Sequence, residues 1–162
     1  KVPLAVTAAA EHYTAVIAER MLTNEYLQSL GRGTEARALL NWHAFEELEH
    51  KSVAFDVYRA VGGDEGTRIA VMAVALGLTL PLLLFSVTLA IARDPIARRR
   101  PVRVARQAWA LFSGPLFRGL MWELAKYMRP GFHPDDIDTT ELLEHWREEL
   151  FGPRGTLVGH LK

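Results

Sequence analysis

Apolar residues recur at helical spacing along most of the chain, and this pattern predicts an all-α protein. Helices are expected over 2–30, 34–61, 69–92 and 102–128, and a last one follows Asp138. Glycines and prolines stand at the junctions, where they are the usual stop signals. Because a short glycine-containing connector joins the first two helices, we expect them to pack antiparallel as half of a ferritin-like helical bundle.

Two helix starts carry capping signals. Thr34 is the expected N-cap of the second helix. Asp138 is the expected N-cap of the last helix, with Glu141 at the third helical position in the reciprocal capping arrangement. The remaining acidic and histidine positions of that helix are interpreted mainly as its solvated face: Glu144, His145 and Glu148.

The third helix is an uncharged run of 24 residues, Ile69–Ala92, bracketed by Arg68 and Arg93. A helix of that length measures about 36 Å, which is enough to span a bilayer with some tilt. Pro81 stands at its midpoint and is expected to kink the helix or to divide it into a re-entrant hairpin. The run is interpreted first as a membrane span, with an interfacial hairpin or a buried soluble core as the alternatives.

A formal net charge of zero conceals local asymmetry. The segment 93–106 holds six arginines and one aspartate, whereas 135–149 holds seven acidic residues and one arginine. Arginines beside an apolar run favour a cytoplasmic location and suit anionic headgroups better than nucleic acid, although a solvated loop remains an equal alternative. The helical stretch over 102–128, broken near Gly114 and Pro115, is rich in aromatics and resembles a helix at a membrane surface, although its aromatics would equally suit a core.

The chain has the length of one domain and contains no cysteine, which excludes disulfides, thiolate metal sites and cysteine nucleophiles. Its organisation is interpreted as a metal-binding half-bundle (1–64), hydrophobic membrane-associated helices (65–128) and a C-terminal loop with an acidic helix (129–162). The chain opens at Lys1 without a methionine, so an upstream segment is expected.

The candidate chemistry is concentrated in Trp42–Asp56. At about 100° per residue, Glu47 lies at about +40° and His50 at about −20° from His43, so the three share one narrow helix face. Glu46 stands at the edge of that face and is a weaker candidate ligand, and Glu49 points away. This E-x-x-H unit is the one that carboxylate-bridged dimetal sites take from each of two helices. A solvated or salt-bridged acidic face is the alternative.

Glu11 of the first helix is a further candidate ligand, because its small neighbours allow a partner helix to come close. An ordinary polar-face role for Glu11 stays open. His133, in a turn-rich loop, is a weaker candidate, since a lone loop histidine is more often structural. A dimetal bundle site needs two glutamates and two E-x-x-H units, of which this chain offers half. Upstream helices or the second subunit of a homodimer would have to supply the rest.

The residues 9–15 (AAEHYTA), 41–58 (NWHAFEELEHKSVAFDVY) and 129–139 (RPGFHPDDIDT) together resemble the bacterial family of predicted metal-dependent hydrolases. This resemblance covers most of the chain. It implies a metal-dependent enzyme, and it implies upstream helices, one with a Gly-Glu pair and one with Gln-Glu-x-x-His, that this sequence does not contain.

The spacing of His43, Glu47 and His50 also resembles the last ligand helix of p-aminobenzoate N-oxygenase-type di-iron proteins, with Glu11 as the glutamate of the preceding helix. That resemblance implies two metal ions, iron first and manganese or zinc as alternatives. On this interpretation His43 is an additional ligand.

Three functions are carried forward. The first is a membrane-associated di-iron oxygenase or oxidase acting on an apolar or lipid-like substrate, with the metal site on the cytoplasmic side. The second is a hydrolase that uses a metal-bound water. The third is a non-catalytic helical membrane subunit. Metal content separates the third from the others, and oxygen consumption separates the first two.

Overall fold

A computed structural model describes residues 1–158. Within that range the protein is all-α and contains no strand, which confirms the predicted fold class. The helices are α1 (Val2–Thr23), α2 (Glu25–Ser29), α3 (Glu35–Glu49), α4 (Val53–Ala60), α5 (Glu65–Arg93), α6 (Pro95–Arg98), α7 (Pro101–Phe112), α8 (Leu120–Ala125) and α9 (Thr140–Phe151). Two short 3-10 turns, η1 (Lys126–Met128) and η2 (Pro134–Asp136), follow α8.

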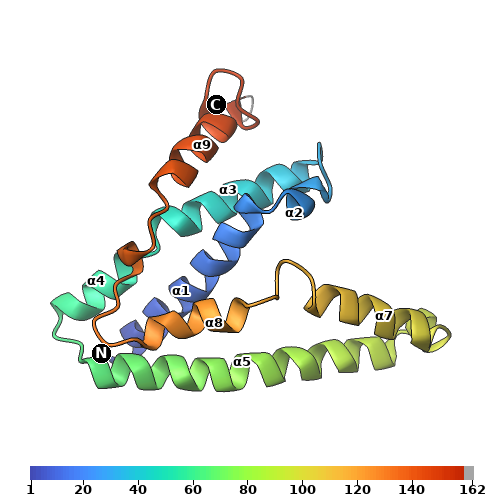
Figure 1. The fold of residues 1–162 in the computed structure, drawn as a ribbon, viewed down its shortest axis with the longest axis horizontal. Helices are drawn as coiled ribbons and strands as arrows, with labels where there is room; N and C mark the ends of the chain where they lie inside the picture. The colour runs from blue at the N-terminus through green and yellow to red at the C-terminus, as the bar shows by residue number, and fades with distance from the viewer. Residues whose placement is uncertain (159–162) are drawn as a thin grey trace.

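Helix α1 lies at the centre of the molecule and contacts α3, α4, α5 and α8. Small side chains make these close approaches possible, since a helix covered by alanines lets neighbouring backbones come near. The buried alanines of α1 are Ala5, Ala8, Ala9, Ala15 and Ala18. The chain runs out along α1 and returns along α3 and α4, so the expected antiparallel pairing of the first two helical segments is confirmed (Figure 1). The ferritin-like assignment of that pair stays a prediction.

The first helix ends earlier than predicted. Helix α1 stops at Thr23, because Asn24 has extended backbone angles and its side chain accepts a hydrogen bond from the N–H of Leu27 at 3.1 Å. Asparagine offers the backbone this local alternative to a continuous helix. The prediction of one helix over 2–30 is therefore wrong in its last quarter, where the separate helix α2 stands instead.

The predicted helix over 34–61 is also divided. Its start is confirmed, because the Thr34 hydroxyl accepts a hydrogen bond from the N–H of Arg37 at 3.2 Å. Helix α3 ends at Glu49, however, and His50 has φ −97° and ψ 0°. Lys51 stabilises the break, because its ammonium group donates to the carbonyl of Ile137 at 2.5 Å and to the hydroxyl of Thr139 at 3.0 Å. Contacts between residues this far apart in sequence carry no local signal.

Helix α9 packs against α3 and covers part of the core. Its half-buried residues Leu142, Leu143 and Trp146 contact the cluster that contains Leu22 and Leu48. The predicted cap is wrong in detail: Thr139 is the N-cap and makes no side-chain capping bond, while Asp138 accepts from the N–H of Thr140 at 3.0 Å. The predicted solvated face is confirmed, with its three residues exposed: Glu144, His145 and Glu148.

The root of α5 is fixed to the body of the molecule by the fully buried Arg68. Its guanidinium donates to the carbonyl oxygens of Tyr127 and Arg129 and to the carboxylate of Glu65. The same group lies 5.0 Å from the Tyr127 ring centroid and 6.0 Å from that of Phe55. Packing against aromatic faces and multiple hydrogen bonds are what a buried guanidinium requires.

Helix α5 continues without interruption for 29 residues and passes through Pro81. The prediction of a hairpin at Pro81 is therefore wrong. The helix is long and apolar enough to cross a membrane, and only 6% of its most apolar window is buried within the protein. Met72 is the last fully buried residue among the residues of α5 whose burial is described, and Leu76 still packs against the core. Farther along, the helix extends away from the rest of the protein as an arm (Figure 1).

The chain turns at α6 and comes back through α7 (Figure 1). We refer to residues 73–118 as the arm. The returning limb is fixed to the body by Arg20 of α1, whose guanidinium donates to the carbonyl oxygens of Pro115, Leu116 and Arg118 at 3.3, 3.1 and 2.7 Å. Gly119 then takes a left-handed conformation, with φ 71°, and leads into α8. Glycine adopts that conformation at little cost.

Candidate functional site

Glu11 lies half-buried on α1, where it faces the start of α4. Its Oε2 accepts a hydrogen bond from the backbone N–H of Ala54 at 3.0 Å. A carboxylate at a helix N-terminus is stabilised by the unsatisfied N–H groups and by the helix dipole. Glu11 therefore joins α1 to α4 through one oxygen.

Glu47 of α3 is attached to α1 through Thr14. The Thr14 hydroxyl donates to Glu47 Oε2 at 2.5 Å, and the same hydroxyl oxygen lies 3.1 Å from the backbone carbonyl of Glu11. Glu11 and Thr14 stand three residues apart and thus on one side of α1. Thr14 therefore holds Glu47 beside the part of α1 that also carries Glu11, whose own carboxylate faces α4.

His43 stands beside Glu47 on α3, with its Nε2 3.4 Å from Glu47 Oε1. The imidazole is 63% exposed, whereas the Glu47 side chain is 26% exposed. The structure thus places the histidine at the open side of the carboxylate. Their spacing of four residues is the one that brings side chains together on a helix.

His50, Glu46 and Glu49 occupy three different environments. His50 is exposed at the C-cap of α3, where its backbone N–H still donates to the carbonyl of Glu46 at 3.1 Å. Glu46 is half-buried. Glu49 accepts from the guanidinium of Arg147 in α9 at 2.7 Å, so it points away from α1, as predicted.

His133 is engaged at both ring nitrogens. Its Nδ1 accepts from the backbone N–H of Asp135 at 3.1 Å, and its Nε2 lies 2.9 Å from Asp56 Oδ1. Since a neutral imidazole that accepts at Nδ1 carries its proton on Nε2, the Nε2–H donates to Asp56. These contacts give His133 a structural role, fastening η2 to α4.

Carboxylate and imidazole donors are the types that iron, manganese and zinc bind in proteins. The types present around Glu47 therefore fit a metal of this kind. Within residues 1–158, however, no group of three or more His, Asp or Glu side chains lies close enough together to hold an ion. Glu11, Glu47 and the histidines beside them thus form an incomplete donor set in the described part of the chain.

The sequence interpretation passed over His12 and Glu19. His12 is 2% exposed, and its Nε2 has no hydrogen-bond partner among the described residues. It lines a narrow cavity together with Glu19, Lys51 and Thr139. A spacing of seven residues places His12 and Glu19 on one face of α1, and this spacing was the signal that could have identified them.

Burial governs the protonation of both groups. Desolvation lowers the pKa of His12 from 6.5 to about 4, so its imidazole is neutral near pH 7. Burial also raises the pKa of the Glu19 carboxyl above its ordinary value, and the nearby charge of Glu123 adds to this effect. This cavity therefore differs from the open side of α3, where His43 stands.

We compared the chain with protein families, with curated proteins and with solved structures. Residues 1–138 match the family described as predicted metal-dependent hydrolase. The chain belongs to this family. Neither the curated proteins nor the solved structures gave a match.

The match to the metal-dependent hydrolase family includes α1, α3 and the loop up to Asp138. The resemblance expected from those three motifs is therefore confirmed. The family description contains metal dependence and hydrolysis, and it lends no support to the likeness with p-aminobenzoate N-oxygenase-type proteins.

Proposed function

We propose that this protein is a metal-dependent hydrolase with a carboxylate-rich centre on the open side of the α1–α3 pair. The observation that carries the proposal is the short hydrogen bond from Thr14 to Glu47, at 2.5 Å, one turn away from Glu11. Membership of the family over residues 1–138 supports the metal dependence and the reaction class.

Glu11, Glu47 and His50 are the proposed ligands, and His43 is an additional one. A bound divalent metal, or a pair of them, would lower the pKa of a coordinated water and polarise the bond to be cleaved. The residues of this chain have supporting roles. Thr14 holds the Glu47 carboxylate in one orientation, and the N-terminus of α4 does the same for Glu11.

The proposed centre needs ligands beyond the described donors, from further helices or from a second copy of the chain. Leu40 supports this part of the proposal, because it stands seven residues before Glu47 and is 45% exposed. Its neighbour Leu39 is 60% exposed. An exposed apolar side chain on the same side of α3 as the carboxylate offers packing for additional helices.

One observation favours a second candidate, an oxygen-activating dimetal enzyme acting on an apolar substrate. All the proposed donors are glutamates and histidines on helices or at helix ends, which is the set found in di-iron and di-manganese bundle proteins. Hydrolysis has the stronger support, because it is the chemistry of the family description.

The test begins with the metal content of the natively purified protein, measured for iron, manganese and zinc. Glu47→Gln and His50→Ala should each lower the metal bound per chain, because each removes a ligand. Glu49→Gln is the control on the same helix, since Glu49 contacts Arg147 instead. Hydrolysis of ester, amide and phosphoester panels is then followed with and without oxygen.

Metal-dependent hydrolysis that proceeds equally without oxygen would support the proposal. Substrate-dependent oxygen uptake without hydrolysis would replace it with the oxygen-activating candidate. Equal metal content in wild type, Glu47→Gln and Glu49→Gln would remove Glu47 from the ligand set.

A further inference from the structure

The arm carries apolar side chains that the rest of the protein leaves uncovered. On α5 beyond Met72 the large exposed ones are Val74, Leu78, Leu82, Leu83, Leu84 and Phe85. Phe85 is 65% exposed. A continuous apolar helix that projects from the body in this way needs an apolar environment to cover it.

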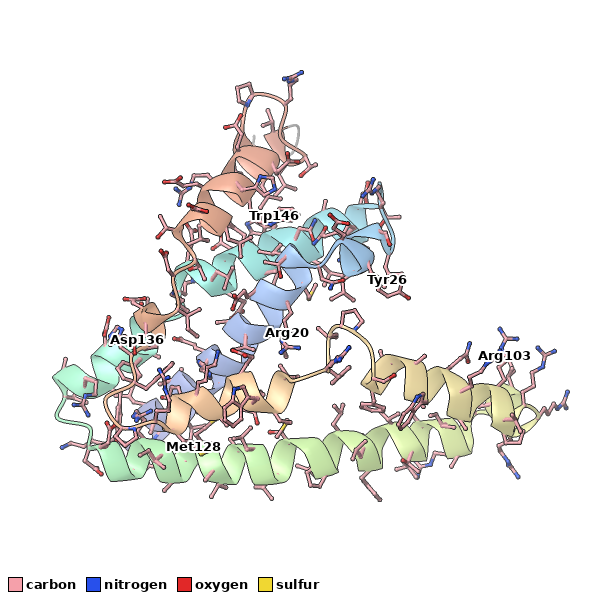
Figure 2. All side chains as sticks on the ribbon, in the orientation of Figure 1. Arg20, Tyr26, Arg103, Met128, Asp136 and Trp146 are labelled. Carbon is pink, nitrogen blue, oxygen red and sulfur yellow. The ribbon has the colours of Figure 1, made fainter. Side chains whose placement is uncertain are left out.

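The far end of the arm is strongly basic. Six arginines lie between Arg93 and Arg106, and Figure 2 shows Arg103 at that end, far from the body. The one acidic residue in this segment, Asp94, accepts hydrogen bonds from the N–H groups of Ile96 and Ala97. The end of the arm therefore presents a positive charge, and its complement is an anionic surface.

Helix α7 is amphipathic. Its half-buried residues, Val104, Ala108 and Phe112, are four residues apart and line one face. Val102 and Trp109 are 82% and 74% exposed. They share a different face of α7, since a spacing of seven residues brings side chains to the same side of a helix. Tryptophan beside arginine is typical of segments at the boundary between headgroups and acyl chains.

Both ends of the arm are attached to the rest of the protein. Arg68 anchors the outgoing limb to Tyr127 and Arg129, and Arg20 anchors the returning limb through three carbonyl groups. If α5 crossed a bilayer, the returning limb would have to cross it as well. That limb carries Arg103 and Arg106, whose charges are costly within the hydrocarbon.

We propose that residues 73–118 form a monotopic membrane arm, which enters one leaflet of an anionic lipid bilayer and leaves it on the same side. The apolar surface of α5 lies among the acyl chains, and the arginines between 93 and 106 contact the headgroups. Neither α5 nor the arginine-rich segment reaches the opposite leaflet. The arm is independent of the metal site, so its role does not rest on the proposed function.

The first experiment is flotation of the purified protein with vesicles. Vesicles of equimolar phosphatidylcholine and phosphatidylglycerol should bind the protein, and vesicles of phosphatidylcholine alone should bind it less. Arg98→Ala with Arg99→Ala should weaken binding to the anionic vesicles by at least about tenfold, since each basic residue near the surface contributes to it. Arg32→Ala with Arg154→Ala removes two exposed arginines of the body and should leave binding unchanged.

A second pair of variants tests the apolar part of the arm. Leu82→Glu with Phe85→Glu should abolish the flotation that persists at high salt. Both side chains are largely exposed, so the variant should fold as the wild type does. Tyr26→Glu with Leu30→Glu places the same charges on exposed apolar positions of the body and should float as the wild type does.

The topology is tested with single introduced cysteines. The chain has no cysteine of its own, so no other residue would react with the thiol label. Arg99→Cys lies at the end of the arm and Glu144→Cys on α9. With protein bound from outside to sealed vesicles, a membrane-impermeant maleimide should label both cysteines. Arg99→Cys that is labelled only after detergent would show a spanning helix and overturn the proposal. Soluble dimers that do not float would also overturn it, because a second copy would then cover the arm.

Discussion

The hydroxyl of Thr14 donates to the carboxylate of Glu47 at 2.5 Å and so connects the centre of α1 with the last turn of α3. The Thr14 oxygen also lies 3.3 Å from the carbonyl of Ala10 and 3.1 Å from that of Glu11. A hydroxyl has one hydrogen, and a carboxylate is a stronger acceptor than an amide carbonyl. The proton therefore goes to Glu47, which fixes one of its two oxygens.

Thr14→Val should weaken metal binding while preserving the shape of α1. Valine has nearly the same volume, so the change removes the orienting hydrogen bond and little else. Loss of such a partner typically lowers metal affinity by about 10–100-fold. Competitive titration with a chelator measures the affinity. Thr7→Val is the matched control, because the Thr7 hydroxyl bonds only to Pro3 of its own helix. Equal losses in both variants would contradict a specific role for Thr14.

Glu11→Gln should lower the free energy of unfolding by about 1 kcal/mol, because the neutral amide interacts less favourably with the N-terminus of α4. Glu11→Ala should cost about 1–2 kcal/mol, because it also leaves the Ala54 N–H without its acceptor. Urea denaturation with a metal chelator present isolates this structural effect. Glu144→Gln, on the exposed face of α9, should leave stability unchanged. A stability of Glu11→Ala equal to wild type would show that the contact is dispensable.

Arg68→Met should destabilise the protein by about 3 kcal/mol, because it leaves the buried carbonyl of Tyr127 and the partly buried carbonyl of Arg129 without their donor. Arg68→Lys should restore only part of this loss, since one ammonium group cannot reproduce the planar fork. Thermal unfolding followed by circular dichroism provides the comparison. Arg93→Met changes the same residue type at the exposed end of α5 and should have little effect.

Stability should fall in mild acid because of His12. Burial lowers the pKa of this imidazole from 6.5 to about 4, so between these pH values the unfolded chain binds a proton that the folded chain does not bind. The contribution of the neutral His12 to the free energy of unfolding is fully present above about pH 6.5 and is lost progressively as the pH falls toward about 4. The loss amounts to about 3 kcal/mol over that window.

Urea denaturation at a series of pH values would measure this slope. His12→Leu should flatten it, because the variant has no titrating group at this position. His145→Leu, which changes an exposed histidine, should keep the wild-type slope. If wild type and His12→Leu show the same dependence on pH, another group is responsible.

Much of the fold could be predicted from local signals. Helical periodicity gave the all-α class, and the cap at Thr34 and the junction at Gly62–Gly63 were located from residue type. The interruptions could not be predicted in the same way. Lys51 holds the break after α3 through Ile137 and Thr139, and neither residue is a sequence neighbour.

At Pro81 an interruption was predicted that the structure does not have. A proline removes one backbone hydrogen bond and usually kinks a helix, yet α5 continues past it. The flanking apolar residues are strong helix formers on both sides, and they maintain the helix where the single proline would interrupt it.

The candidate site was partly predictable. Helical spacing brought His43 beside Glu47 and turned Glu49 toward the other side of α3, as the structure has them. Thr14 was missed as a partner, because nothing in its own sequence neighbourhood indicates which residue of α3 it faces. His12 was missed because its seven-residue spacing from Glu19 shows that they share a helix face but does not show that this face is buried. The ligand roles of Glu11, Glu47 and His50 stay predictions.

The adjacency of the two ends of the arm has a consequence for the architecture. Arg68 and Arg20 fasten the departing and returning chain to the same body, so the whole of 73–118 is topologically a long insertion between two packed helices. Its length and composition can therefore change without altering the register of α1 against α3. The core and the arm can therefore evolve as separate modules, the core constrained by the candidate site and the arm by the environment that covers it.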